Sequence, residues 1–314
     1  MDLPIRSLHH VTATVSDAQE DLDFYARLLG LRLVKKTVNF DNHNVYHFYY
    51  GDNRGSPSTI MTTFPYRDWG VAVGKKGAGQ ITVTSFAVPA DSLGFWRDRL
   101  AAHWVAWREG TTLFGEASLE FEDPSGLNIR LVAAKADARQ PWVAPGIEAA
   151  TAIHGLHSVT LQIREPAKTL ALLTDVLGFT ITNEAEHATR VAISTDEPGK
   201  LLEIAAAPDA PAAVNGLGTV HHVAMAITDE DEQLRVRKEL LRLDYKVTEV
   251  RDRQYFRSIY FREPGGVLYE IATVRPGFTV DEDLGRLGQD LKLPPWEEPH
   301  RSSIEQHLPR VQTP

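Results

Sequence analysis

The chain has 314 residues, a formal net charge of −9 and no cysteine. The length suits two domains of ordinary size, while the acidic balance and the lack of any run of Lys and Arg argue against nucleic acid as a partner. Without cysteine, disulfides and thiolate metal sites are excluded. Any metal must therefore be held by His, Asp or Glu side chains.

No stretch is apolar over the roughly 18 residues that a membrane-spanning helix needs, and the N-terminal residues MDLPIRS contain no apolar signal core. We therefore expect a cytoplasmic protein with no membrane partner. A homo-oligomer stays open as an interpretation, because no exposed helix carries an obvious apolar interface stripe.

Four segments share one plan in chain order, and they begin at Leu8, Ile81, Leu156 and Val220. Each is typical of a strand, a turn rich in Asp, Pro or Ser, an amphipathic helix and then further strands. In the first segment the helix is indicated by apolar residues at helical spacing, which are Leu22, Tyr25, Leu28 and Leu29. Gly30 then suits a C-terminal cap. The pattern predicts a βαβββ module, repeated four times.

A linker rich in Ala and Pro separates the second module from the third and indicates a boundary near residue 147. Residues 1–147 and 148–276 would each hold two modules. The modules are expected at about 7–66, 80–134, 154–207 and 218–275. After Pro276 the pattern changes, and residues 277–314 are expected to form a C-terminal arm that packs against the body.

Adjacent histidines open the first strand of the first module, LHHVT, and of the fourth, VHHVA. Neighbouring side chains of a strand point to opposite faces, so one histidine of each pair should share the packed face with the apolar residues. His9 alternates with Val11, Ala13 and Val15 on that face. His221 alternates in the same way with Val223, Met225 and Ile227. His10 and His222 are left on the open face as candidate metal ligands.

Glu270 lies in the apolar stretch GGVLYEIAT of the fourth module, where its neighbours Tyr269 and Ile271 belong to the other face. A carboxylate inside such a strand needs a partner, because burying an unpaired charge is costly. Two imidazoles and one carboxylate form the ligand triad of non-haem Fe(II) enzymes, which leaves positions open for substrate and dioxygen. One histidine at a strand start is more often structural. The repeated pair and the inward Glu270 together favour a metal site.

The motifs LHHVT, HHVA and REPGGVLYEIAT resemble the vicinal oxygen chelate superfamily of glyoxalases, bleomycin resistance proteins and extradiol dioxygenases. The sequence is most similar to the branch of hydroquinone-type ring-cleaving dioxygenases. The similarity covers nearly the whole chain, including VYHFYYGD, DRQYFRSIYFREPGG and DLKLPPWEEP. It implies an α+β fold in which four βαβββ modules form two open-barrel domains. Modules one and four would share one barrel, and modules two and three the other.

The resemblance places the metal ligands on His10, His222 and Glu270, in agreement with the alternation of side chains. It also implies a set of catalytic residues beside the metal, which are His9, Thr12, His221, Arg253 and Tyr260. Alternation supports Tyr260, since its neighbours Ile259 and Phe261 face the packed side. The sequence indicates Arg253 less clearly as a site residue, because Arg251 and Arg257 are close in sequence. The implied cofactor is Fe(II), with Mn(II) as the alternative that the same ligands accept.

The expected function is a non-haem Fe(II)-dependent, extradiol-type ring-cleaving dioxygenase that opens a hydroquinone- or catechol-type aromatic diol with O₂. One alternative is a glyoxalase-like metal-dependent isomerase or lyase. Such an enzyme usually needs a second carboxylate, and the last strand of module one, SPSTIMTTFP, contains none. The other alternative is a metal-free protein that binds small molecules, which the intact triad disfavours.

The equivalent positions in modules two and three differ. Module three has Ser158 in place of the ligand histidine but retains Glu203, and module two has Arg130 at the carboxylate position. We predict one metal site, with Glu203 and Arg130 paired in the second barrel. A Gly-rich loop with Trp69 is expected to cap the substrate. The aromatic residues expected to line the pocket are Tyr46, Phe48, Phe64, Trp69 and Phe256.

Overall fold

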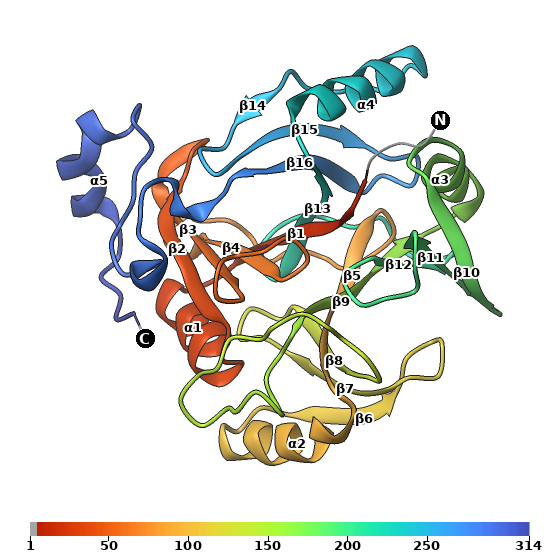
Figure 1. Ribbon diagram of the computed structural model, residues 1–314, viewed down its shortest axis with the longest axis horizontal. Helices are drawn as coiled ribbons and strands as arrows, with labels where there is room; N and C mark the ends of the chain where they lie inside the picture. The colour runs from red at the N-terminus through yellow and green to blue at the C-terminus, as the bar shows by residue number, and fades with distance from the viewer. Residues whose placement is uncertain (1–4, 314) are drawn as a thin grey trace.

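Two eight-stranded, curled sheets form the body of the protein, which a computed structural model describes for residues 5–313. Most helices pack against the sheets, whereas the last one lies at the periphery in the C-terminal segment (Figure 1). The fold is α+β, as predicted. Each sheet combines two modules: the first sheet joins modules one and four, and the second joins modules two and three. This is the pairing that the resemblance implies.

The first sheet contains the beginning and the end of the repeated region. Its strands in spatial order are β14 (Arg251–Asp252), β15 (Phe256–Arg262), β16 (Leu268–Pro276), β13 (Thr219–Ile227), β1 (Ser7–Val15), β4 (Ile60–Pro65), β3 (Asn42–Gly51) and β2 (Arg32–Asn39). The central pair, β1 and β13, is antiparallel, and each of them has a parallel neighbour on its other side.

The second sheet repeats this arrangement with the middle of the chain. Its strands in spatial order are β10 (Phe179–Ala185), β11 (Ala188–Ile193), β12 (Leu201–Ala206), β9 (Gly155–Ile163), β5 (Gln80–Pro89), β8 (Asn128–Ala134), β7 (Ala117–Glu122) and β6 (Trp107–Thr111). Here β5 and β9 form the antiparallel central pair.

The helices are short. They are α1 (Ala18–Leu22), which continues as a π-helix (Asp23–Leu28), α2 (Leu93–Ala102), α3 (Pro166–Ala171), which continues as a π-helix (Leu172–Val176), α4 (Glu230–Arg242) and α5 (Arg301–His307). Single turns of 3₁₀-helix occur at Arg67–Trp69, Ala90–Ser92, Phe278–Val280, Leu284–Arg286 and Glu298–His300. Within the described range, no helix has the length and apolar character required to cross a bilayer.

The first helix begins and ends where its sequence dictates. Asp17 accepts hydrogen bonds from the backbone N–H groups of Gln19 and Glu20, which satisfies donors that have no partner within the helix. Gly30 follows the helix at φ +69°, and a Cβ atom there would lie 2.4 Å from Cδ1 of Ile147. Only glycine combines this left-handed backbone with such a close contact.

The register of the first sheet aligns the candidate ligands. On β1 and β13, His10 lies opposite Ala224 and Thr12 lies opposite His222. On β13 and β16, Ala224 lies opposite Glu270. His10 and Glu270 are therefore two strands apart in one row, and only a small Ala224 side chain stands between them.

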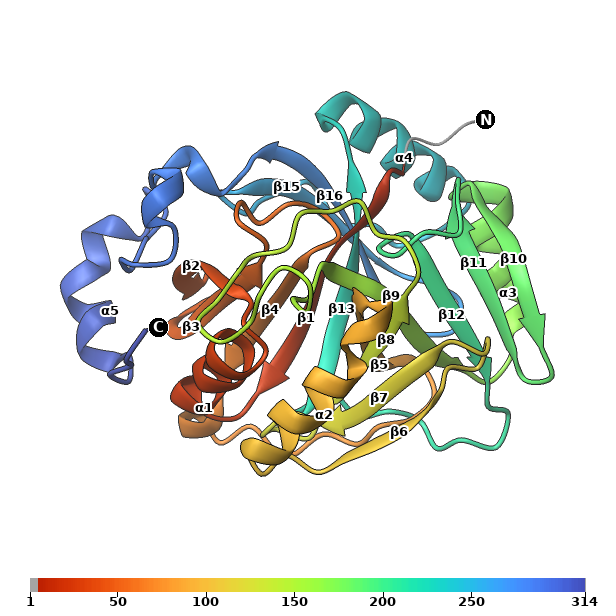
Figure 2. The ribbon, with the colours of Figure 1, turned by 60° about the horizontal axis from the view of Figure 1, so that its bottom comes forward.

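The residues after Pro276 run beside β2 and β3 at the far end of the first sheet (Figures 1 and 2). Lys35 of β2 is fully buried there, and its Nζ lies 2.6 Å from Asp281 Oδ1 and 2.5 Å from Glu282 Oε2. The hydroxyl of Tyr46 donates to the backbone carbonyl of Pro309 at 3.1 Å. Buried charge pairing and strand contacts thus hold this segment against the sheet.

Candidate metal centre

Three buried side chains from three adjacent strands converge at the floor of the first sheet. His10, His222 and Glu270 come from β1, β13 and β16, and one ligand atom of each lies within 4.8 Å of the others. The Nε2 atoms of the two histidines are 3.3 Å apart. Oε2 of Glu270 lies 3.3 Å from Nε2 of His10 and 2.8 Å from Nε2 of His222.

The chemistry of this group fits a divalent metal ion. Oε2 of Glu270 is fully shielded from solvent and has no hydrogen-bond partner of good geometry among the described residues. Burial alone would raise the pKa of Glu270, but the imidazoles of His10 and His222 hold it well below its usual range. Burial also lowers the pKa of His222. An ionised carboxylate beside imidazoles in a buried site is a donor set suited to Fe(II) or Mn(II).

Each of the three groups has a neighbour that orients it. Nδ1 of His9 lies 2.8 Å from Nδ1 of His10, and Nδ1 of His221 lies 2.7 Å from Nδ1 of His222. The hydroxyl of Ser258 donates to Oε1 of Glu270. Contacts of this kind fix the ring orientation and tautomer of metal-ligating histidines. With these contacts made, Nε2 of both rings and Oε2 of the carboxylate remain available and lie close to one another.

The contacts between adjacent histidines depend on two β-bulges. The register of β1 with β13 skips His9 between Leu8 and His10, and it skips His221 between His222 and Val220. A bulge disrupts strict alternation and changes the direction of a side chain. The expectation that His221 lies on the packed face is therefore wrong: its side chain is exposed to solvent at the edge of the cavity.

A cavity of about 430 Å³ opens above the three ligand atoms, a size typical of small-molecule sites. Of the residues that the resemblance implies, Thr12, His221, Arg253 and Tyr260 line it. His9 is buried behind His10 instead and packs on Phe256 at 5.0 Å between ring centroids. The structure therefore places His9 in contact with a candidate ligand, His10, and outside the cavity lining.

The aromatic lining differs in part from the predicted one. Phe64 and Phe256 line the cavity as expected, together with three rings that were not predicted, Phe40, Tyr49 and Tyr66. The other predicted rings, Tyr46, Phe48 and Trp69, do not line it. Trp69 is 44% exposed. The prediction that Trp69 caps the cavity is wrong.

The structure shows that Arg253 makes different contacts from Arg251 and Arg257. Nε of Arg253 donates to the hydroxyl of Tyr260 at 3.0 Å, and Nη2 donates to Asp41 Oδ2 at 2.9 Å. Burial raises the pKa of Tyr260, so the phenol is protonated at neutral pH. Arg257 pairs with Asp252 at 2.6 Å outside the cavity. Arg251 reaches the cavity rim but is half-exposed.

The polar residues of the site that sequence reasoning missed include His47, Asp41 and Ser258. His47 lines the cavity from β3, and its Nε2 lies 2.7 Å from Oγ1 of Thr62. The alternation in VYHFYYGD places His47 on the same face as Tyr49 and could have indicated it. No signal in the sequence relates Asp41, in the turn between β2 and β3, to Arg253.

Comparison with known proteins agrees with this geometry. The sequence matches the Glyoxalase/Bleomycin resistance protein/Dioxygenase superfamily over residues 7–131 and 155–271. The chain belongs to this superfamily. A relative from Bacillus subtilis (strain 168), named "Putative ring-cleaving dioxygenase MhqE", is 43% identical over 304 residues, which cover 97% of this chain and 98% of the relative.

Two further members of the superfamily match over almost their whole length. The chlorohydroquinone/hydroquinone 1,2-dioxygenase of Sphingobium indicum is 35% identical over 305 residues, which cover 94% of each chain. A crystal structure of a "putative dioxygenase" from Bacillus subtilis is 39% identical and has a TM-score of 0.94, with 99% of each chain covered. Both sheets and their order are thus those of the vicinal oxygen chelate fold.

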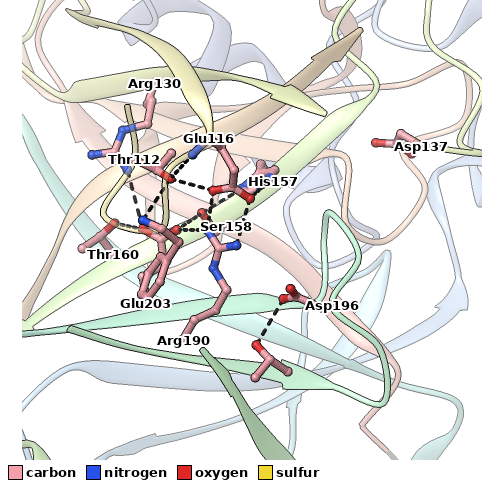
Figure 3. A network of polar contacts seen from close by, with 12 residues as sticks. Thr112, Glu116, Arg130, Asp137, His157, Ser158, Thr160, Arg190, Asp196 and Glu203 are labelled. Atoms are coloured by element: carbon pink, nitrogen blue, oxygen red, sulfur yellow. Dashed lines mark hydrogen bonds and ion pairs between the residues drawn. The ribbon is translucent and has the colours of Figure 1, made fainter. Parts of the chain in front are cut away.

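The second sheet of this superfamily member holds a different polar centre (Figure 3). Glu203 is fully buried, and its Oε1 accepts a hydrogen bond from Nη2 of Arg190 at 2.9 Å. Its Oε2 accepts one from Thr160 at 2.9 Å and lies 3.5 Å from Nη1 of Arg130. The predicted pairing of Arg130 with Glu203 is confirmed. Within residues 5–313, His10, His222 and Glu270 form the one cluster of metal-ligand type.

Proposed function

We propose that the protein is an aromatic ring-cleaving dioxygenase that opens a hydroquinone- or catechol-type diol with O₂. Fe(II) is the proposed cofactor, held by His10, His222 and Glu270, and Mn(II) is the alternative. The observation that carries the proposal is the convergence of these three ligand atoms beneath an aromatic-lined cavity. The ring-cleaving activity named for relatives that match almost the whole chain supports it.

When bound, the ion supplies the redox chemistry that allows an aromatic diol to react with O₂. Both atoms of O₂ enter the ring-opened product, so the two substrates account for every atom and no further reductant is needed. The proposed cleavage is of the extradiol type, which breaks a ring bond beside the hydroxyl-bearing carbons rather than between them.

The surrounding residues prepare the substrate for this reaction. Phe64 and Phe256 line the cavity and provide flat apolar contacts for an aromatic ring. Arg253 places a permanent positive charge next to Tyr260, where it stabilises an oxyanion formed from a substrate hydroxyl. His221 lies at the solvent edge and contacts His222, and it is the proposed carrier of the proton that this hydroxyl releases.

The glyoxalase-like alternative requires a second carboxylate in the first sheet. The position on β4 that corresponds to Glu270 on β16 is Thr62, since Thr62 lies opposite Thr12 as Glu270 lies opposite Ala224. Thr62 is a neutral hydroxyl and already bonds to Thr12 and His47. The ligand set therefore favours the dioxygenase. The cytoplasmic location stays a prediction.

The test is anaerobic loading with Fe(II), followed by measurement of O₂ uptake with catechol, hydroquinone, chlorohydroquinone and methylhydroquinone. We expect one O₂ per substrate and a new ring-opened absorption band with at least one diol. Glu270→Gln should abolish both, whereas Glu120→Gln, on the second sheet, should not. Stoichiometric metal without O₂ uptake would favour an isomerase or lyase. A protein that binds no metal would overturn the proposal in favour of a binding protein.

A further inference from the structure

His47 is a polar residue of the cavity wall that none of the roles above involves. It lies on β3, which the sheet order places on the opposite side of β1 from β15, the strand that holds Tyr260. Both residues line the same cavity. The imidazole of His47 packs against two rings in tilted arrangements, with centroids 4.0 Å from Tyr49 and 4.2 Å from Phe64. These contacts hold it in the cavity wall.

The hydrogen bonds around His47 favour one tautomer. With the hydroxyl of Thr62 donating to Oγ1 of Thr12 at 3.2 Å, Oγ1 of Thr62 is left to accept from Nε2 of His47, which lies 2.7 Å away. A neutral imidazole with a hydrogen on Nε2 has an acceptor lone pair on Nδ1. Burial lowers the pKa of His47 well below its usual value, which maintains the neutral ring.

The acceptor on Nδ1 has no partner among residues 5–313, and Nδ1 is also absent from the polar atoms that are both unpaired and fully shielded. It is therefore open to the cavity that His47 lines. The neighbouring polar groups are paired: Asp41 with Arg253, and the hydroxyl of Tyr66 with the side-chain amide of Asn39 at 2.8 Å. This wall thus offers one imidazole acceptor to a ligand.

The internal symmetry of the first sheet suggests a simpler, alternative role for His47. Tyr49 lies opposite Thr62 on β3 and β4, as Tyr260 lies opposite Glu270 on β15 and β16. His47 precedes Tyr49 by two residues, as Ser258 precedes Tyr260. Ser258 orients Glu270, so the symmetry alone would have His47 orient Thr62. That role uses Nε2 and leaves Nδ1 without a function.

We propose that Nδ1 of His47 accepts a hydrogen bond from a hydroxyl of the substrate, so that His47 selects diols over their methyl ethers. This rests on the proposed function, because it requires an aromatic diol in the cavity. A hydroxyl can donate to Nδ1, whereas a methoxy group cannot. An unmade hydrogen bond in a buried site costs both the contact and the desolvation of the acceptor.

Two substitutions distinguish the role of Nδ1 from that of Nε2. In His47→Gln the side-chain amide takes the place of Nε2 and can still contact Thr62, but nothing replaces Nδ1. In His47→Asn an amide oxygen takes the place of Nδ1, but the contact with Thr62 is lost. Binding is measured by anaerobic calorimetry on the Fe(II)-loaded protein, without turnover. The probes are hydroquinone with 4-methoxyphenol, and catechol with 2-methoxyphenol.

We expect the wild type to prefer at least one diol over its ether, and His47→Gln to reduce that preference about threefold to tenfold, as for one neutral hydrogen bond. His47→Asn should retain most of the preference.

Equal preferences in the wild type and in a folded His47→Gln variant would overturn the role of His47 alone. Loss of preference in His47→Asn but not in His47→Gln would assign the effect to Thr62 and likewise overturn it. A wild type that binds neither diol would overturn the proposed function as well.

Discussion

Four equivalent positions surround the centres of the two sheets, and the residue type differs at three of them. The first sheet has His10, His222, Thr62 and Glu270 there, and the second sheet has Val83, Ser158, Arg130 and Glu203. Both sheets keep a buried carboxylate. In the first sheet two imidazoles beside the carboxylate leave a place for a cation, whereas in the second sheet the guanidinium groups of Arg130 and Arg190 supply the cation. A buried carboxylate needs a positive partner, and the two sheets meet that need in different ways.

The β-bulges occur at equivalent places in the two sheets, so the sheets differ here in side chains and not in backbone arrangement. In the first sheet they occur at His9 and His221. In the second sheet the register of β5 with β9 skips Thr82 and His157 at the equivalent places. His157 contacts Oγ of Ser158 at 3.1 Å, as His221 contacts His222. The backbone therefore presents an adjacent pair of side chains in either sheet, and only in the first sheet do the pairs include candidate metal ligands.

The largest contrast is expected from removing the equivalent residues His222 and Ser158. His222→Ala should lower the affinity for Fe(II) about 100-fold or more, because loss of an orienting partner alone costs roughly 10- to 100-fold. Ser158→Ala should leave the affinity unchanged. Anaerobic competition with a chromogenic chelator measures both. Equal affinities in the two variants would contradict the assignment of the metal to the first sheet.

The second sheet should lose stability when its internal cation is removed. Arg190 is buried, and it joins Glu203 to Glu116, where its Nη2 lies 2.5 Å from Oε2 of Glu116. Arg190→Met should lower the free energy of unfolding by about 3 kcal/mol, because it leaves a buried carboxylate with weaker compensation. Urea denaturation of the metal-free protein measures this. Glu203→Gln in the same background should recover part of the loss. A loss below about 1 kcal/mol would show that Arg130 alone suffices.

A third contrast concerns the buried faces of α1 and α3. Asp21 and Thr169 lie eleven residues after His10 and Ser158 respectively, and both are buried. Burial raises the pKa of Asp21 from 3.8 to about 8. The folded state then retains a proton that the unfolded chain releases, so this contribution is present below about pH 4 and is lost as the pH rises towards 8.

Asp21→Asn should remove this dependence. The free energy of unfolding of the variant, relative to wild type, should rise by at least about 1 kcal/mol between pH 4 and pH 8, as one pKa unit corresponds to 1.36 kcal/mol. Thr169→Ser is the matched control and should show no such trend. Parallel pH profiles of Asp21→Asn and wild type would contradict the prediction.

The smallest effect is expected at Trp69. Since Trp69 lies outside the cavity lining, Trp69→Ala should change kcat/KM for the best diol by less than about twofold, which corresponds to less than about 0.5 kcal/mol. Phe64→Ala, in the wall beside His47, should lower it about tenfold or more through the lost aromatic contact. Steady-state O₂ uptake compares the two. A larger effect at Trp69 would restore its role as a cap.

The sequence predicted the fold and the ligand cluster because both depend on repetition. The module plan occurs four times, and the histidine pair occurs twice at the same place in a module. Alternation then distinguished His10 and His222 from their neighbours. It failed for His221, because a bulge interrupts the alternation just where the chain turns a side chain towards the site.

The remainder of the site depends on contacts between distant segments. The pairing of Asp41 with Arg253 joins a hairpin turn of module one to the turn between β14 and β15 in module four, 212 residues later. Trp69 was placed in the cavity because an aromatic residue in a Gly-rich loop suits a lid, but it is 44% exposed and does not line the cavity. Neither outcome follows from local pattern, since both are set by packing between modules.

The pairing of β1 with β13 also sets the order in which the two halves can be completed during synthesis. All eight strands of the second sheet have been synthesised by residue 206, whereas the first sheet requires β16, which ends at Pro276. His10 emerges among the first residues of the chain, yet its partners His222 and Glu270 come more than two hundred residues later. Domains generally fold as units during synthesis. The second sheet can therefore fold before β13, the pairing partner of β1, has been synthesised. The candidate metal centre is therefore among the last parts of the repeated region to be synthesised in full.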